Sequence, residues 1–447
     1  MVLPTLDHSD LAARIRGLMP SLRTTLDDLV RRPSVSSGPD PEPLRATAEA
    51  VATLFREAGA TARLLEAPDA PPAVLAEVSA PRGAPTVLLY AHYDVQHPGS
   101  AALWTSPPFE PAERGGRLYG RGVSDDKSGI VAHLGALRAF EGAPPVGVKV
   151  LIEGEEEIGS PHLASFLAAY RDDLAADVIV IADLEHAAVG QPGVTTSLRG
   201  LVDCVVEVRT LASGVHSGQF GGAVPDALTA LVRLLATLHR DDGTPAIDAL
   251  VRAPRDAAHP TEEDVRAHAG VLEGVRLLGD GTVADRLWYG PAISILAIDA
   301  PSVAEAINQL VPVARAKVGV RLAPGDDPAR AMDALVAHLE SHVPWGVHVH
   351  VTRGASARPF SLTTDGRVYD AFRAGLRAAW STDAVEIGVG GTVPLVAEFA
   401  ETYPNATIVM AGVGDPTSHI HGPDESQDLG ELERNVLAEA IALRLLA

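Results

Sequence analysis

Cysteine is almost absent from this sequence, and so are long apolar runs. The single cysteine, Cys204, excludes an intrachain disulfide, and the alternating pattern of residues 201–206 around it predicts a buried structural thiol. No window is apolar enough to cross a bilayer, and residues 1–7 lack the basic and apolar regions of a signal peptide. We therefore expect a cytoplasmic protein with no membrane partner.

Basic residues are few relative to acidic ones. The 447 residues include 36 Lys and Arg against 58 Asp and Glu, which gives a formal net charge of -22. This excess of negative charge argues against nucleic acid and against anionic membrane surfaces as partners. It identifies no other partner, because an acidic surface also simply keeps a protein in solution. The length exceeds what one hydrophobic core usually needs, so two domains are expected.

The pattern of apolar residues predicts where these two domains lie. Strand-like and helical patterns alternate through the first 200 residues and again after Pro359, which is typical of an α/β domain with a mostly parallel sheet. Residues 201–355 instead follow the order β-α-β-β-α-β of a ferredoxin-like unit. We therefore predict a discontinuous catalytic domain, residues 1–200 and 356–447, with an α+β domain inserted at residues 201–355.

Four apolar, strand-like runs each lead into residue types that bind metals. They lead to His92 and Asp94, to the acidic run 153–157, to Asp183, and to the loop that carries His419 and His421. Sites in open α/β sheets form at the carboxyl ends of the strands, so these side chains are expected at one edge of the sheet. Imidazole and carboxylate groups gathered there suit a zinc-like or manganese-like cation.

The spacing within these motifs suggests a division of roles. His92 and Asp94 share one face of an extended chain, so His92 can bind metal while Asp94 holds its other ring nitrogen. A carboxylate in the tight loop 120–129 can bridge two cations, although an acid pair there can equally cap the helix that follows. In the run 153–157, one Glu can bind metal while its neighbour takes a proton from bound water.

Two choices stay open on spacing alone. Glu185 and His186 are competing ligand candidates directly after Asp183. His419 and His421 also lie two residues apart, and only one of them need be a ligand.

Taken together, these motifs resemble a known family of metallohydrolases. It includes carnosine-type dipeptidases, glutamate carboxypeptidases, aminoacylases and succinyl-diaminopimelate desuccinylase, and the dipeptidase branch is the most similar. The resemblance covers nearly the whole chain. It rests on His-Tyr-Asp-Val-Gln at 92–96, Gly-Arg-Gly at 120–122 with Asp-Asp-Lys at 125–127, and Glu-Gly-Glu-Glu-Glu at 153–157. It implies two divalent metal ions, zinc with manganese or cobalt as alternatives, and a homodimer formed through the inserted domain, which also acts as a lid.

The resemblance also implies roles for individual residues. Glu156 is implied as the general base, Asp94 as the residue that orients His92, and His216, within the His-Ser-Gly segment of the inserted domain, as the group that polarises the scissile carbonyl. The implied metal ligands are His92, Asp125, Glu157, Asp183 and His421, with Asp125 bridging both metals. The implied substrate-binding residues are His216, Arg321, Gly391 and Thr392.

Two segments depart from the family pattern. Relatives often carry Arg-x-Gly-Gly-Ser-Ile-Pro near the substrate, whereas residues 388–394 are Gly-Val-Gly-Gly-Thr-Val-Pro. After His421, Gly422 and Asp424 stand where Ser and Asn are commoner. We expect substrate specificity and local hydrogen bonding to differ accordingly.

The leading hypothesis is a dinuclear metal-dependent hydrolase that cleaves the amide bond of dipeptides or similar small peptides. A metal-bridging water would attack the carbonyl after losing a proton to Glu156. An N-acyl amino acid deacylase or a carboxypeptidase would share the same metal site. A non-catalytic binding protein on this fold is the alternative of another class, and loss of a ligand or of the base would indicate it.

Overall fold

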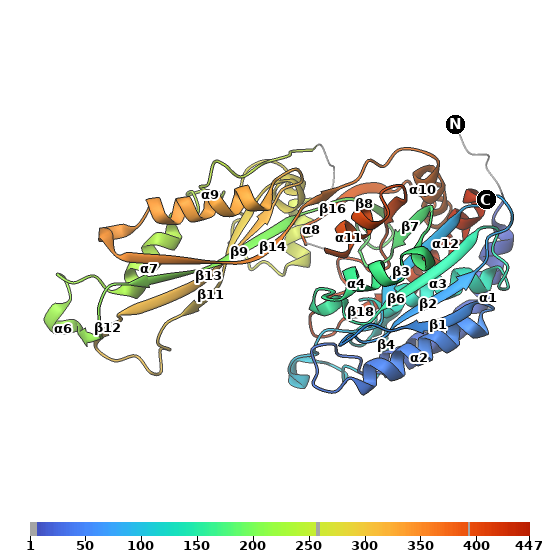
Figure 1. The fold of residues 1–447 in the computed structure, drawn as a ribbon, viewed down its shortest axis with the longest axis horizontal. Helices are drawn as coiled ribbons and strands as arrows, with labels where there is room; N and C mark the ends of the chain where they lie inside the picture. Colours follow the sequence, from blue (N-terminus) through green and yellow to red (C-terminus); the bar gives the residue numbers. More distant parts are fainter. Residues whose placement is uncertain (1–6, 256–259, 392–393) are drawn as a thin grey trace. The chain divides into compact units, whose positions relative to one another are not determined.

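The computed structural model describes residues 7–255, 260–391 and 394–447, and the chain forms two compact units (Figure 1). The first unit comprises Met1–Thr196, Leu362–Ile387 and Pro394–Ala447, and the second comprises Ser197–Ser361 and Gly388–Val393. The domain boundaries predicted from the sequence lie at residues 200 and 355.

A short segment of the second unit, Gly388–Val393, follows Ile387 of the first unit in sequence. This segment was predicted to belong to the catalytic domain, but hydrogen bonds from Arg199 connect it to the second unit. The backbone N–H of Arg199 donates to the carbonyl of Val389 at 3.1 Å, and its side-chain Nε donates to the carbonyl of Gly390 at 3.1 Å. The alternating strand and helix pattern gave no sign of this association, because it depends on contacts between segments far apart in sequence.

The main sheet has nine strands, and the four in its middle run parallel. Antiparallel strands extend it on both sides. In sheet order the strands are β1 (Thr61–Leu65), β2 (Ala73–Val78), β6 (Gly147–Glu153), β3 (Thr86–His92), β7 (Val178–Ile181), β17 (Thr407–Met410), β8 (Gly193–Leu198) and β15 (Phe360–Ser361), and β16 (Val385–Val389) pairs with β8.

Both faces of this sheet are covered, which explains why the central strands β3, β7 and β17 are mostly apolar. Val87, Leu89 and Ala91 of β3 point into the main hydrophobic core, whereas Tyr90 points to the other face and its ring meets Phe399 at a centroid distance of 5.6 Å. The helices that contribute to the main core are α1 (Ser9–Val30), α2 (Glu42–Glu57), α3 (Lys127–Ala139), α10 (Arg367–Trp380) and α12 (Leu429–Leu446). The predicted mostly parallel α/β fold is confirmed.

Smaller elements complete the first unit. Phe399 lies on α11 (Pro394–Thr402), which contacts α4 (Leu163–Ala169). A three-stranded sheet is formed by β4 (Ala112–Arg114), β5 (Arg117–Tyr119) and β18 (Ser426–Asp428). The remaining short helices are η1 (Ala101–Leu103), η2 (Glu156–Ile158) and α5 (Arg171–Leu174).

The second unit has the β-α-β-β-α-β order of a ferredoxin-like fold. Its four-stranded antiparallel sheet has the order β11 (Ala292–Asp299), β13 (Val313–Leu322), β9 (Gly200–Arg209) and β14 (His348–Ala357). Helices α7 (Ala227–Ala236) and α9 (Pro328–Ser341) pack against this sheet and enclose a second core. Shorter elements are β10 (Val215–His216), α6 (Ser217–Phe220), α8 (Glu262–His268), the π-helix η3 (Asp285–Tyr289), β12 (Gln309–Leu310) and η4 (Pro344–Gly346).

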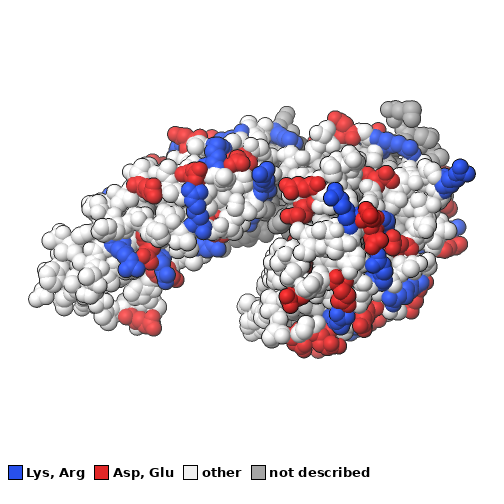
Figure 2. Space-filling view, viewed as in Figure 1, with Lys and Arg blue, Asp and Glu red and all other residues white. Residues whose placement is uncertain are grey.

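Two surface properties follow from the described residues. None of the helices in the described part of the chain is long and apolar enough to span a membrane. On the face drawn in Figure 2, acidic and basic side chains of the described residues are interspersed.

Candidate metal centre and active site

The candidate site lies where the parallel strands of the first unit end. His92 is the last residue of β3, Asp183 lies two residues beyond the end of β7, and Glu157 follows closely after β6. Because these strands are parallel neighbours, their carboxyl ends meet at one edge of the sheet. The sheet thus brings together side chains that are up to about 90 residues apart in sequence.

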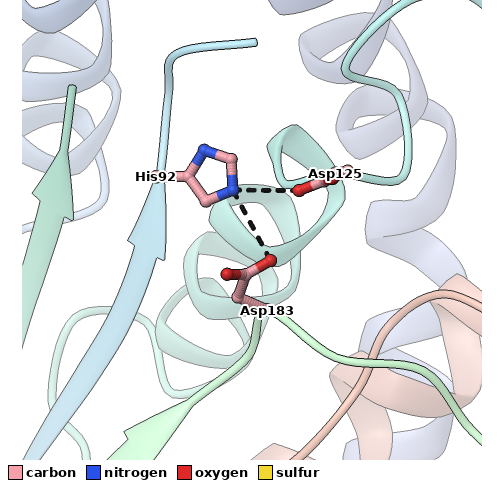
Figure 3. Close-up of side chains that lie close together, drawn as sticks. All are labelled: His92, Asp125 and Asp183. Atoms are coloured by element: carbon pink, nitrogen blue, oxygen red, sulfur yellow. Dashed lines mark hydrogen bonds and ion pairs between the residues drawn. The ribbon is translucent and has the colours of Figure 1, made fainter. Parts of the chain in front are cut away.

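Two of these side chains, His92 and Asp183, form a largely buried group with Asp125, which we call the inner trio. Nε2 of His92 lies 2.9 Å from Oδ1 of Asp125 and 3.5 Å from Oδ1 of Asp183. Figure 3 shows both carboxylates directed at this one ring nitrogen. One atom from each residue lies within 4.8 Å of the others, a spacing that could hold a metal ion.

A second group, the outer trio, consists of Asp125, Glu157 and His421. Nε2 of His421 lies 3.0 Å from Oδ2 of Asp125 and 3.0 Å from Oε2 of Glu157. Asp125 therefore presents one carboxylate oxygen to each trio. The structure brings together all five residues that the sequence analysis named as ligands, and their arrangement is suited to two cations that share one carboxylate.

Asp94 holds both the inner imidazole and the start of η2. Nδ1 of His92 lies 3.0 Å from the backbone carbonyl of Asp94 and 3.3 Å from its Oδ1. The two carboxylate oxygens of Asp94 accept hydrogen bonds from the backbone N–H groups of Glu156 and Glu157, each at 3.1 Å. Asp94 thus contacts the His92 ring as predicted, and it also fixes the backbone of the two glutamates.

The three residues of the Asp-Asp-Lys motif have different contacts: one lies in the candidate site, and two hold the surrounding backbone. Asp125 belongs to the trios, whereas the side chain of Asp126 accepts a hydrogen bond from the backbone N–H of Gly129 and caps α3. The buried Lys127 donates from Nζ to the carbonyls of Leu29 and Arg32, at 2.9 and 2.8 Å. The helix-cap interpretation therefore holds for Asp126, whereas the ligand role of Asp125 stays a prediction.

The charges in the site perturb one another strongly. Hydrogen bonds to Asp125 and Glu157 raise the pKa of His421 to about 10. Burial raises the pKa of Asp183 to about 6, and the charge of Asp125 adds to this shift. Burial and then the charge of Asp183 raise the pKa of Glu156 well above its ordinary value. Crowded carboxylates of this kind lose their mutual repulsion when a divalent cation lies among them, so the donor set fits metal ions.

The competing candidates near Asp183 differ in their surroundings. The ring of His186 is held away from the trios, because Nε2 bonds the side-chain oxygen of Asn435 at 2.9 Å and Nδ1 accepts from the backbone N–H of Gly193 at 3.1 Å. Glu185 belongs to neither trio. Burial, followed by the charges of Asp415 and Asp125, raises the pKa of Glu185 to about 8.

In the last loop, His421 rather than His419 belongs to a trio. The side chain of His419 is exposed, and its carbonyl accepts a hydrogen bond from the backbone N–H of Gly422 at 2.8 Å. This tight turn carries the ring of His421 toward Asp125.

Comparison with known proteins shows the family. The model of peptidase family M20/M25/M40 matches residues 88–443. The chain belongs to this family. It is therefore a peptidase, and the resemblance predicted from its motifs is confirmed.

Related proteins and a solved structure agree with this assignment. The chain is 37% identical over 364 residues to the cysteinylglycine-S-conjugate dipeptidase of Corynebacterium striatum, which covers 80% of each chain. It is 28% identical over 372 residues to the human Beta-Ala-His dipeptidase, covering 78% of this chain and 73% of that protein. The crystal structure of human carnosine dipeptidase 1 matches with a TM-score of 0.83 and 25% identity, covering 99% of this chain and 100% of the other.

The substrate-binding residues implied for this M20 peptidase lie in the second unit. His216 ends β10, is exposed, and accepts a hydrogen bond at Nδ1 from the backbone N–H of Gly218 at 3.0 Å. Arg321 is half-buried near the end of β13, where its charge adds to burial in lowering the pKa of Arg199 to about 10. Gly391 belongs to the segment that Arg199 holds, and Thr392 lies outside the described residues. Their roles stay predictions.

The glycine that replaces the family's Arg has a steric reason. A Cβ atom on Gly388 would lie 2.6 Å from Cβ of Trp288 in η3 and 3.0 Å from Oγ of Ser197. Trp288 thus fills the space that a side chain at position 388 would need.

Asp424, in the second segment that departs from the family pattern, accepts hydrogen bonds from the backbone N–H and the hydroxyl of Thr105 at 2.9 and 2.6 Å.

One important residue received no role in the sequence analysis. The buried carboxylate of Glu425 accepts hydrogen bonds from the backbone N–H groups of Gly122, Ser124 and Asp125, at 2.8, 2.9 and 3.1 Å. It also accepts from Nη1 of Arg121 at 2.7 Å. Glu425 therefore holds the loop that presents Asp125. It ends the His-Gly-Pro-Asp-Glu segment, and its place in that motif was the signal that could have identified it.

Proposed function

We propose that this M20 peptidase is a metal-dependent dipeptidase. The observation that carries the proposal is the pair of trios that share Asp125, with Glu156 held beside them by Asp94. The relatives support the substrate class, because two similar proteins are named dipeptidases for cysteinylglycine S-conjugates and for Beta-Ala-His.

The ligand sets would hold two divalent cations. His92, Asp125 and Asp183 would hold one, and Asp125, Glu157 and His421 would hold the other. When bound, such cations polarise a carbonyl oxygen and lower the pKa of water. We propose zinc as the metal, with manganese and cobalt as alternatives, because imidazole with carboxylate ligands suits all three.

Glu156 is proposed to move the proton. It would accept a proton from the attacking water and deliver it to the amine that leaves. Two features support this role: its backbone N–H is fixed by Asp94, and its carboxylate belongs to neither trio.

The second unit is proposed to complete the substrate site. His216 would stabilise the negative charge that develops on the carbonyl oxygen, and Arg321 would bind the substrate carboxylate. Gly391 and Thr392 are proposed as further substrate-binding residues. The nearby charge of Arg199 supports an anion-binding role for this region. We further propose a homodimer formed through the second unit and a cytoplasmic location.

The direct test is amine release by the metal-reconstituted protein from dipeptides, tripeptides and N-acyl amino acids of matched side chains. Glu156→Gln, assayed in parallel, provides the blank. We expect turnover of dipeptides that the blank lacks. Preference for N-acyl amino acids would indicate a deacylase, and preference for tripeptides would indicate a peptidase of longer chains. Lack of turnover with every substrate would contradict the proposal and favour a binding protein.

A further inference from the structure

Gln96 ends the His-Tyr-Asp-Val-Gln segment and contacts Glu157, a ligand candidate of the outer trio. Its backbone N–H donates to Oε1 of Glu157 at 2.9 Å, and its side-chain Nε2 donates to the backbone carbonyl of Glu157 at 3.2 Å. Gln96 therefore holds both the carboxylate and the backbone of this glutamate.

Other contacts complete the set of partners around Glu157. Its backbone N–H donates to Oδ2 of Asp94 at 3.1 Å, and its Oε2 lies 3.0 Å from Nε2 of His421. The Glu157 side chain is only 3% exposed, so these contacts replace water around it. Because the backbone of Gln96 holds Oε1, the other oxygen of Glu157 is the one that faces His421 and the place of an outer cation.

The segment that carries Gln96 is itself fixed by the chain that follows α1. The backbone N–H of Val95 donates to the carbonyl of Ser34 at 2.9 Å, and the hydroxyl of Ser34 donates to the carbonyl of Tyr93 at 2.6 Å. Ser34, Tyr93 and Val95 are all buried. The side chain of Gln96 therefore extends from a well-held backbone, which allows it to hold Glu157 in one position.

We propose that Gln96 is a positioning residue that sets the affinity of the outer trio for its cation. The inference rests on the proposed two-cation function. Glu157 belongs to the outer trio alone, and the ring of His92 in the inner trio is held by Asp94 instead. Loss of the Gln96 amide should therefore weaken the binding of the outer cation and leave that of the inner cation unchanged.

The test removes the amide and keeps the length of the side chain. Gln96→Met loses the hydrogen bond to the carbonyl of Glu157 but keeps the backbone N–H that holds Oε1. In a titration of the zinc-loaded protein with a competing chelator, the outer cation should bind about 10-fold more weakly and the inner cation within about twofold of the wild type. Gln96→Ala, which removes the whole side chain, should give the same selective loss.

A ligand variant identifies which step of the titration belongs to the outer cation. His421→Ala removes a member of the outer trio alone, so the step that it abolishes is the outer one. Adding Gln96→Met to His421→Ala should then leave the remaining step unchanged.

Gln191→Met is the matched control. Gln191 is also half-buried, and its Nε2 donates to the backbone carbonyl of Asp383 at 2.8 Å, so this variant loses the same kind of hydrogen bond. Gln191 belongs to neither trio, and its loss should change the affinity for neither cation.

The response of activity to added metal separates positioning from a general effect on the fold. Hydrolysis of alanyl-alanine by Gln96→Met should be impaired at limiting zinc and should return to the wild-type rate at saturating zinc. An activity that stays low at saturating zinc would overturn the proposed role.

The metal titration has two further outcomes that would contradict specific claims. Equal weakening of both cations, or no change in either, would overturn the role of Gln96 and leave the dipeptidase proposal intact. A wild type that binds fewer than two zinc ions per chain would instead contradict the proposed two-cation function.

Discussion

The inner and outer trios share Asp125 but differ in how the chain builds them. The side chain of His92 is fully buried at the end of a central strand, whereas that of His421 is 54% exposed on a loop. His92 is held by Asp94 at its second ring nitrogen, and Asp183 follows a neighbouring strand. The inner trio is therefore a product of sheet topology, and the outer trio depends on the tight turn after β17. We expect the outer cation to bind more weakly and to exchange faster.

The largest effect is expected where the two trios meet. Asp125→Asn removes a negative charge from both trios, so the protein should lose both cations and all measurable activity. Asp183→Asn, the matched control, changes the inner trio alone and should keep the outer cation. Metal content by mass spectrometry checks both variants. If Asp125→Asn still binds two metal ions per chain, Asp125 is not the shared ligand.

Glu156 should affect turnover and leave both trios intact. Glu156→Gln keeps the shape of the side chain but cannot accept the proton, so kcat should fall by about 10²- to 10⁴-fold. Metal content should stay at the wild-type value, because Glu156 belongs to neither trio. A variant with normal turnover would show that another group is the base.

Glu425 should matter for the geometry of the shared ligand. Glu425→Gln replaces one of the two acceptor oxygens that hold Gly122, Ser124 and Asp125, so the loop that presents Asp125 loosens. Affinity for both cations should fall by about 10- to 100-fold. Titration with a competing chelator measures this loss. An effect confined to thermal stability, with unchanged metal affinity, would show that Glu425 serves the fold only.

The affinity of the outer trio for its cation should depend on pH through His421, which belongs to the outer trio and not to the inner one. The pKa of His421 in the metal-free protein is raised to about 10, so below that pH a cation must displace its proton. Affinity at the outer trio should therefore rise with pH by about tenfold per unit up to pH 10, and the gain should end above it. Calorimetry in two buffers of different ionisation enthalpy counts the protons released, and His421→Ala should release fewer. Equal proton release by the wild type and this variant would contradict the assignment.

Much of this organisation could be predicted because it depends on local patterns. The apolar runs before His92 and Asp183 form β3 and β7. Parallel strands then place the residues that follow them at one edge, so the ligand types were predictable as a group.

The remaining choices depend on contacts between distant segments. His186 is excluded as a ligand by Asn435 of α12, and the ring of Trp380 on α10 lies 4.7 Å from it. The sequence around Asp183 gives no information about Asn435 or Trp380, because both lie far away along the chain. Glu425 acts on a loop about 300 residues earlier in the chain, so its role appears only in the folded structure. The association of Gly388–Val393 with the second unit has the same origin.

The central claim is that two cations share Asp125, and a crystal structure of the zinc-loaded protein tests it most directly. Anomalous scattering at the zinc edge should give two peaks, one among His92, Asp125 and Asp183 and one among Asp125, Glu157 and His421. A single peak, or a second peak without Asp125 among its ligands, would contradict the account.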